Sequence, residues 1–340
     1  MFSFHRRKSR PSVDPSPPSP MPPIPSPIPV LLVGQIYQDT ILYMDDYPKE
    51  DSKIRAKDME QRRGGNICNT AEVLCQFPRM DPHVMSCLGT KEASSPLVSG
   101  LEEIGIKTQA CVYRPTPLPS SYIIQSSQSG TRTIISCNKT IELNLEEFIH
   151  HFDATPPYAW VHFEGRNIDN TVQQIDWLSS KAQQEGWSLK ISVELEKPDR
   201  PDIDLLLAKG DVVFFSKLFA QTRNYHHPKD FLRSIQPQCK VGATLFCTWG
   251  EGGATCLLPS GEIHHASAIP VHQVIDSVGA GDTFIAGIIF CLTRQLHVLT
   301  ALKFACEMAS RKVEKVGFNG LAEMMRKLWE ASLDLAAPSR

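Results

Sequence analysis

The sequence lacks the features that mark several large classes of protein. Its ten cysteines include no C-x-x-C pair, which argues against a zinc site. It has no run of about 18 apolar residues, so no transmembrane helix is expected. The net charge of −2 and the pI near 6.6 favour neither nucleic acid nor an acidic membrane surface as a partner. The G-x-x-x-x-G-K-S/T loop of many nucleotide hydrolases does not occur either.

The composition suits a single large domain that follows a proline-rich tail. The 340 residues are 41% hydrophobic, enough for one α/β domain with a small appendage. Most cysteines lie in apolar runs, as Cys247 does, so we interpret them as buried hydrophobes of a reducing compartment and expect a cytoplasmic protein. Residues 11–29 contain ten prolines, which predicts an extended tail over 1–29. A PxxP ligand for an SH3-like domain and a mitochondrial leader remain alternatives.

Beyond the tail, strand-like and helix-like stretches alternate along the chain. The strand candidates are 30–33, 122–125, 131–136, 160–163, 189–194, 211–215, 244–248, 255–258 and 271–275, and the helix candidates are 66–76, 96–103, 170–185, 282–292 and 299–312. Such alternation predicts a mainly parallel sheet with crossover helices, whose ligands lie beyond the carboxyl ends of the strands. We place this domain at 30–325 and a C-terminal tail at 326–340.

Several strand candidates do not follow this alternation. Strands 122–125 and 131–136 flank Ser129-Gly130, a hairpin signal, while 42–47 and 53–55 have no helices beside them. These stretches predict a small antiparallel sheet that projects over the cleft, with lid strands within about 40–65 and 110–137.

The most informative stretch is the octet Asp-Ser-Val-Gly-Ala-Gly-Asp-Thr at 276–283, which follows a β-branched stretch and precedes an apolar run. Gly279 and Gly281 allow backbone N–H groups to approach an anion, and the start of the predicted helix adds unpaired donors. Asp282 can accept a proton beside such an anion. A small-molecule kinase needs both parts. The alternative is a tight turn in which Asp282 only caps the helix or balances its dipole.

A second group of polar residues lies near the start of the chain. Asp39 follows the first strand and can accept hydrogen bonds from sugar hydroxyls, or it is a turn residue or cap. Gly65 permits close backbone approach, and Asn66 and Asn69 are three residues apart at a helix start, so both amides can face one ligand. Asparagine both donates and accepts, which suits a vicinal diol. Alternatively, Asn66 is the helix cap.

Three stretches in the second half of the chain could face a nucleotide. The loop 248–254 is rich in glycine and lies between two strands, although a plain hairpin would look the same. Lys217 follows a strand end and could approach a phosphate, although most lysines are solvated. Phe304, Cys306 and Met308 lie on a predicted helix, where such residues are more often core than a platform for a base.

The octet resembles the signature of the PfkB, or ribokinase-like, carbohydrate kinases. Further runs resemble the ketohexokinase (fructokinase) branch of that family: 47–52, 63–66, 119–121, 132–134, 164–167 and 193–198. The similarity covers roughly Val30 to Gly320, although ketohexokinases carry fewer glycines in the loop at 248–254. It implies a ribokinase-like three-layer α/β/α sandwich with a mainly parallel central sheet and a small antiparallel β lid.

The resemblance also implies roles for particular residues. Gly279, Ala280 and Gly281 form an anion hole, Asp282 is the general base, and Arg132 lies near the phosphoryl-transfer path. The positions that match sugar contacts or the sugar cleft are Asp39, Asp51, Gly65, Asn66, Asn69 and Glu164, and those that match the nucleotide side are Glu251, Gly253, Lys217 and Cys306. From the residues alone, Arg132 could be a solvated hairpin charge, and Glu164 could simply pair with Arg166.

These observations together predict a kinase that uses ATP and Mg²⁺, with a monovalent cation such as K⁺ as a further option. The resemblance favours D-fructose as the acceptor, giving fructose 1-phosphate. Ribose, another hexose or a nucleoside is the alternative acceptor, and a catalytically silent sugar or nucleotide sensor is the alternative class of protein. The expected partners are the sugar and ATP, with no nucleic acid and no membrane, and the lid is expected to form a homodimer.

Overall fold

The computed structural model describes residues 26–126, 132–152 and 157–336, so residues 1–25 of the proline-rich tail and the Ser129-Gly130 turn lie outside the described residues. The last two residues of the expected tail, Ile28 and Pro29, instead begin the first strand of the central sheet. This central sheet has eight strands in the order β14-β13-β12-β11-β10-β9-β1-β4. The strands are β1 (Ile28–Val33), β4 (Met80–Met85), β9 (Trp160–Glu164), β10 (Lys190–Leu195), β11 (Val212–Phe215), β12 (Thr244–Thr248), β13 (Ala254–Leu257) and β14 (Ile263–Ala266). All are parallel from β4 to β12, and β13 and β14 run antiparallel at the edge.

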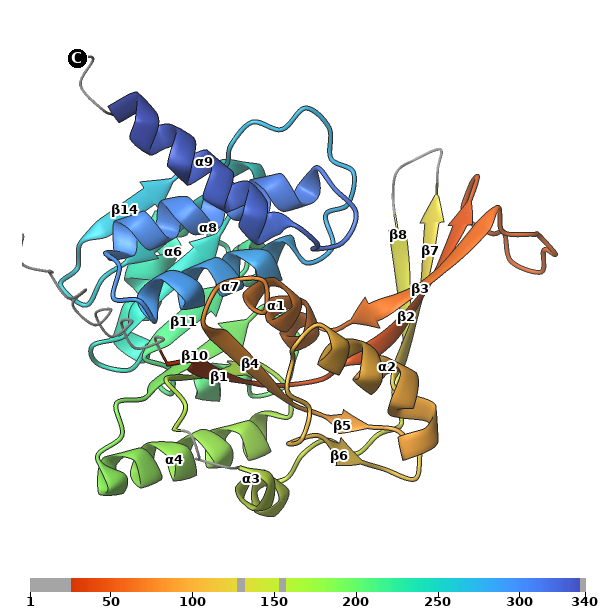
Figure 1. Cartoon of the computed structure of the whole chain (residues 1–340), viewed down its shortest axis with the longest axis horizontal. Coiled ribbons are helices and arrows are strands. Elements are labelled where there is room, and N and C mark those ends of the chain that lie inside the picture. The colour runs from red at the N-terminus through yellow and green to blue at the C-terminus, as the bar shows by residue number, and fades with distance from the viewer. Residues whose placement is uncertain (1–25, 127–131, 153–156, 337–340) are drawn as a thin grey trace, which may run out of the picture.

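Helices cover both faces of this sheet, because successive side chains of a strand point to opposite sides (Figure 1). Val30 and Leu32 of β1 belong to one apolar core, while Leu31 and Val33 belong to the other. The first core is closed by α1 (Asn66–Leu74), α2 (Lys91–Glu103), α7 (Ala280–Leu292), α8 (Val298–Val313) and α9 (Leu321–Ala336). The second is closed by α3 (Leu145–His151), α4 (Ile168–Glu185), α5 (Lys217–Gln221) and α6 (Pro228–Ile235). The result is the expected three-layer sandwich.

A separate four-stranded sheet projects from one side of this body as a lid (Figure 1). Its order is β3-β2-β7-β8, with β2 (Tyr37–Met44), β3 (Asp58–Gly64), β7 (Ser120–Ser126) and β8 (Arg132–Cys137). The β2–β3 and β7–β8 pairs are antiparallel, but β2 and β7 are parallel, so the expected antiparallel lid is a mixed sheet. Asp39 and Ser121, which are paired in register, are buried on the inner face, whereas Tyr122 is exposed on the outer one.

The short elements complete the framework. They are the strand pair β5 (Cys87–Leu88) and β6 (Val112–Tyr113) and the 3₁₀ turns at Ile203–Leu206, Gln236–Gln238 and Gly250–Gly252. The ten cysteines are free and mostly buried, although Cys137 is exposed on β8. No helix within the described ranges is long and apolar enough to cross a membrane.

Several expected elements are wrong or were not predicted. The β-branched stretch 271–275 forms no strand: Val274 and Ile275 are exposed, and the N–H of Ile275 donates to the carbonyl of Val313. Residues 53–55 are irregular as well. Strand β4 was not predicted because it contains Pro82, which is tolerated there only because β4 is the edge of the sheet. The expected C-terminal tail from 326 is instead helical for most of its length, since α9 continues to Ala336.

Candidate active site

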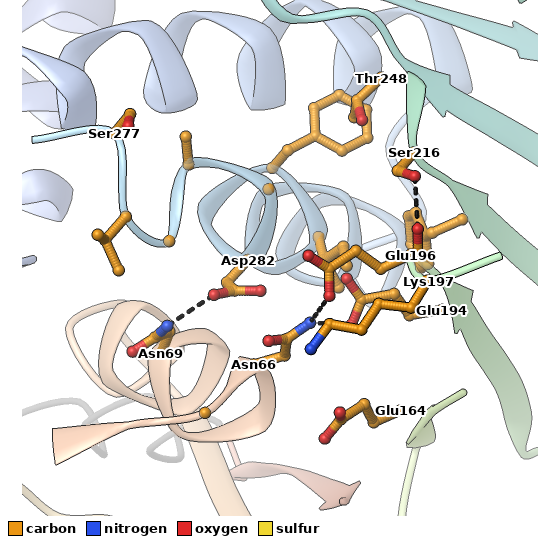
Figure 2. A pocket seen from close by; sticks show the side chains of 18 of the residues that line it. Asn66, Asn69, Glu164, Glu194, Glu196, Lys197, Ser216, Thr248, Ser277 and Asp282 are labelled. Carbon is orange, nitrogen blue, oxygen red and sulfur yellow. Dashed lines mark hydrogen bonds between the residues drawn. The ribbon is translucent and has the colours of Figure 1, made fainter. Parts of the chain in front are cut away.

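The lid and the carboxyl ends of β9 to β12 enclose a pocket of about 400 Å³. Its lining includes ten of the residues that the sequence singled out: Asp39, Gly65, Asn66, Asn69, Arg132, Glu164, Gly279, Ala280, Gly281 and Asp282. They come from the lid, the starts of α1 and α7, and the end of β9. Figure 2 shows Asp282 on α7 facing the two asparagines of α1 across the pocket.

Asp282 is a buried carboxylate in the first turn of α7 and is not the cap of this helix. Gly279 is the N-cap of α7 and Asp282 is the third helical residue, with only 6% of its surface exposed. Asn69 Nδ2 donates to Asp282 Oδ2 at 2.7 Å, which fixes the carboxylate towards the pocket. Burial raises the pKa of Asp282 to about 8, and the nearby carboxylates Glu196 and Glu164 add to this shift, while the Asn69 hydrogen bond opposes it. Such a pKa suits proton transfer near neutral pH.

The glycine turn before Asp282 has the geometry that an anion site requires. Gly279 has φ +75°, and a Cβ there would lie 2.4 Å from the ring of Phe318. A Cβ on Gly281 would meet no atom within 4 Å, so the backbone is open at this point. The first N–H groups of a helix have no partner within the helix, and those of Ala280, Gly281 and Asp282 begin α7 beside the pocket. The N–H of Ala280 also donates to the carbonyl of Ser277 at 3.4 Å.

Asp276, the first residue of the octet, anchors this turn. Lys312 Nζ donates to both its main-chain oxygen and its Oδ2 at 2.8 Å, and Arg62 Nη1 lies 3.3 Å from Oδ2. The N–H of Val278 donates to Asp276 Oδ1 at 3.0 Å. Burial alone would raise the pKa of Asp276. These contacts lower the pKa, and the hydrogen bond from Lys312 has the largest lowering effect. Lys312 is fully buried on α8 and was not predicted, because a lysine on a helix is usually solvated.

Two carboxylates that the sequence did not assign to the site complete its floor. Asn66 Nδ2 donates to Glu194 Oε2 at 3.1 Å and to Glu196 Oε2 at 3.0 Å (Figure 2). Gly65 is the N-cap of α1, so the interpretation of Asn66 as the cap is wrong. Burial, and then the charge of Asp282, raises the pKa of Glu194 well above its usual range. A glutamate at the buried end of an apolar strand is the signal that could have revealed Glu194.

Glu164 lies at the pocket and also forms the ion pair with Arg166 that the sequence suggested. It lines the pocket, and its carboxylate pairs with Arg166 at 3.2 Å and with Arg200 at 3.3 Å. The N–H of Gln35 also donates to Glu164 Oε2 at 3.1 Å. Burial would raise the pKa of Glu164, but the two arginines outweigh it and lower the pKa, so this carboxylate is charged at neutral pH.

The lid contributes Asp39 and Arg132 to the pocket. Burial raises the pKa of Asp39, while a hydrogen bond from Ser121 and the charge of Arg62 act against this rise. A Cβ on Gly64 would lie 2.1 Å from Asp39 Oδ2, so only glycine fits beside this carboxylate. Arg132 Nη1 donates to Ser277 Oγ at 3.2 Å, which places the guanidinium at the turn rather than in bulk solvent.

Five of the predicted site residues do not line this pocket. Asp51 is exposed in the loop between β2 and β3. Glu251 is exposed and Gly253 closes the loop before β13, while Cys306 is buried in α8. Lys217 lies 5.8 Å from the centre of the Trp249 ring. The neighbouring residues Ser216 and Thr248 do line the pocket, and Phe304 and Met308 belong to the core.

The sandwich, the lid and the glycine turn beside a buried carboxylate define an ATP-dependent carbohydrate kinase. Residues 29–323 match the model of the pfkB family of carbohydrate kinases, and the chain belongs to this family. It is 32% identical to a ketohexokinase of Mus musculus over 86% of this chain and 98% of that protein.

Solved structures agree with the fold. A ribokinase from Giardia lamblia superposes with a TM-score of 0.75 at 17% identity, covering 90% of this chain and 99% of its own. A ribokinase from Arabidopsis thaliana, complexed with ribose and ATP, gives a TM-score of 0.73 at 19% identity, covering 89% and 98%.

The raised pKa of Asp282 predicts how its replacement changes stability with pH. Between the usual value of 3.8 and about 8, the folded protein keeps a proton on Asp282 that the unfolded chain has released. The stability that the protonated Asp282 provides is therefore full below pH 3.8, and it is lost as the pH rises through the folded-state pKa of about 8. An asparagine side chain cannot ionise, so we expect Asp282→Asn to raise the Tm by an amount that grows from about pH 4 and levels off near pH 8.

Thermal unfolding followed by circular dichroism across this range would check the expectation. Asp199→Asn, at an exposed aspartate outside the pocket, is the matched control and should show no such trend. A Tm difference for Asp282→Asn that does not change with pH would contradict the assignment of a raised pKa.

Proposed function

We propose that the protein transfers the γ-phosphoryl group of ATP to a hydroxyl of a ketohexose, converting D-fructose to fructose 1-phosphate. One observation carries the proposal: the buried carboxylate of Asp282 lies between the glycine turn and the polar residues that the sequence assigned to a sugar. The identity to a ketohexokinase over most of both chains supports the choice of acceptor.

Each residue of the pocket has a defined part in the proposed reaction. The sugar hydroxyl loses its proton to Asp282 as its oxygen forms a bond to the γ-phosphorus, and the bond to the leaving oxygen of ADP breaks in line. The N–H groups of Ala280, Gly281 and Asp282 stabilise the charge that develops on the phosphoryl oxygens. Arg132, held beside the turn through Ser277, neutralises part of the same charge.

The acceptor is held by the opposite end of the pocket. Asp39, Asn66 and Asn69 offer the acceptors and donors that vicinal hydroxyls need. We assign Asp51 to the acceptor as well, although it lies outside the pocket of its own chain.

Mg²⁺ fits the chemistry of this site. Glu194 and Glu196 are hard oxygen donors at the pocket wall, and Mg²⁺ is usually held by one or two carboxylates together with substrate phosphates. No cluster of three or more His, Cys, Asp or Glu side chains in the described part of the chain could hold a metal alone. Held by these two carboxylates, the ion would draw off charge from the phosphate groups.

A monovalent cation has no step in this proposal. Lys312 donates hydrogen bonds to two oxygens of Asp276 beside the turn, so an ammonium group already pairs with this carboxylate. We therefore leave K⁺ without a role.

We place the nucleotide along the loop before β13, with Glu251, Gly253, Lys217 and Cys306 near it. Ser216 and Thr248 support this direction, since they line the end of the pocket beside that loop. Two alternatives remain: a kinase of the same family with ribose, another hexose or a nucleoside as acceptor, and a silent sensor. The fold match to ribokinases suits the first, and the complete base and turn argue against the second.

The base assignment predicts the effect of removing Asp282. Asp282→Ala should lower kcat by about 10² to 10⁴-fold, the usual contribution of a general base, while ATP still binds. ADP release coupled to NADH oxidation would measure turnover, and calorimetry would measure ATP binding. A variant that keeps a tenth of the wild-type kcat would show that Asp282 is not the base.

The choice of acceptor predicts the outcome of a substrate panel. D-fructose, D-ribose, D-glucose and adenosine are each offered with ATP and Mg²⁺, and D-fructose should give the highest kcat/KM. A higher kcat/KM with ribose or adenosine would identify that compound as the acceptor instead of fructose. If no sugar of a broad set led to ADP release, the sensor would be favoured.

We also propose that the lid joins two copies of the chain. Its outer face carries apolar side chains that are about half exposed: Tyr122 at 47%, Ile135 at 51% and Met59 at 59%. Tyr122 and Ile135 are paired in register, so their side chains lie next to each other on the sheet and form an apolar row. A second lid could cover this row, because a sheet face of this kind is a common interaction surface.

Light scattering after size exclusion should therefore give twice the monomer mass for the wild type at micromolar concentration. The double substitution Tyr122→Glu and Ile135→Glu should give the monomer mass, while Leu205→Glu, at an apolar residue 52% exposed on another face, should not. A monomeric wild type would refute the lid dimer.

A further inference from the structure

Two arginines at opposite edges of the lid reach adjacent residues of the phosphate turn. Arg62 on the edge strand β3 contacts Asp276 Oδ2 at 3.3 Å, and Arg132 on the edge strand β8 donates to Ser277 Oγ at 3.2 Å. The lid sheet is thus bound to the turn on both sides. Arg132 lines the substrate pocket, but Arg62 does not, so substrate contact does not explain Arg62.

Arg62 lies between two carboxylates with different tasks. It is paired in register with Asp39, the lid residue that faces the acceptor, and its charge is felt by that carboxylate. Its guanidinium also contacts Asp276, whose side chain is 11% exposed against 19% for Arg62. A pair this well shielded from water is screened less than a surface pair. Arg62 therefore connects the acceptor end of the pocket to the anchor of the turn.

Asp276 can transmit such a contact to the catalytic residues. Its carboxylate accepts the N–H of Val278 and the ammonium of Lys312, so its position sets the backbone just before Gly279. A second cavity of about 420 Å³ lies against the same turn and is lined by Arg62, Asp276 and Val278. Arg62 therefore borders space that no protein atoms fill, and it can follow a movement of the lid without displacing the core.

We propose that Arg62 is a positioning residue that couples closure of the lid over the acceptor to the placement of the phosphate-binding turn. The proposal rests on the kinase function above. Acceptor binding at Asp39 holds β2 and β3 in place, β3 holds Arg62, and Arg62 holds Asp276. ATP then meets a turn that is already ordered. The two substrates should consequently bind with positive coupling that depends on the Arg62 guanidinium.

Calorimetry with a non-hydrolysable ATP analogue and Mg²⁺, with and without D-fructose, tests the coupling. In the wild type we expect the sugar to tighten binding of the analogue at least about fivefold, the lower end of typical allosteric coupling. Arg62→Gln should reduce this factor to about one. Arg62→Lys keeps the positive charge but not the planar guanidinium with its several donors, so it should retain part of the factor. The control is Lys57→Gln, which removes an exposed ion pair with Asp45 from the same sheet and should keep the full factor.

Hydrogen–deuterium exchange of the free protein gives a second readout that needs no sugar. Arg62→Gln should speed exchange of the amides at 276–283 relative to the wild type, and Lys57→Gln should not. Equal exchange in Arg62→Gln and the wild type, or an undiminished coupling factor in the variant, would overturn the proposal. Failure of D-fructose to bind the wild type would refute the acceptor alone, and the exchange experiment would still decide on Arg62.

Discussion

The hydrogen bond from Asn69 to Asp282 is the contact on which the site depends. It joins the starts of α1 and α7, two helices that enter the site from distant parts of the chain and each begin after a glycine with positive φ. Both partners are buried, and a buried carboxylate that lost its donor would cost about 1–3 kcal/mol or more. The bond therefore fixes the carboxylate that we propose as the base, and it also aligns two helix N-termini on one pocket.

The turn and the carboxylate of Asp282 could be placed together from the sequence because their residues are contiguous. The octet contains the turn, Asp282 and the start of α7 within a few positions, and backbone geometry alone brings them together. Asn66 and Asn69 could be predicted as a pair for the same reason, since both lie in the first turns of α1. Their meeting with Asp282 could only be inferred from the family resemblance, because nothing local relates α1 to α7.

The supporting charges could not be predicted in this way. Lys312, Arg62 and Glu194 are residue types that are usually solvated, and only tertiary packing buries them beside partners distant in sequence. The fold shows a similar division. Strands buried on both faces are continuous apolar runs, which the sequence displays clearly, whereas edge strand β4 and the irregular 271–275 depend on what lies beside them.

The pocket is polarised along its length. The turn presents main-chain donors, with Arg132 beside them, whereas Asp39 and Asn66 offer oxygens and an amide to hydroxyl groups. A negative group is attracted to the turn, while uncharged hydroxyls suit the oxygens and the amide of Asp39 and Asn66. A molecule with an anion at one end and uncharged hydroxyls at the other can therefore lie in the pocket in one direction only, so the orientation of a ligand is decided by charge before any specific contact forms.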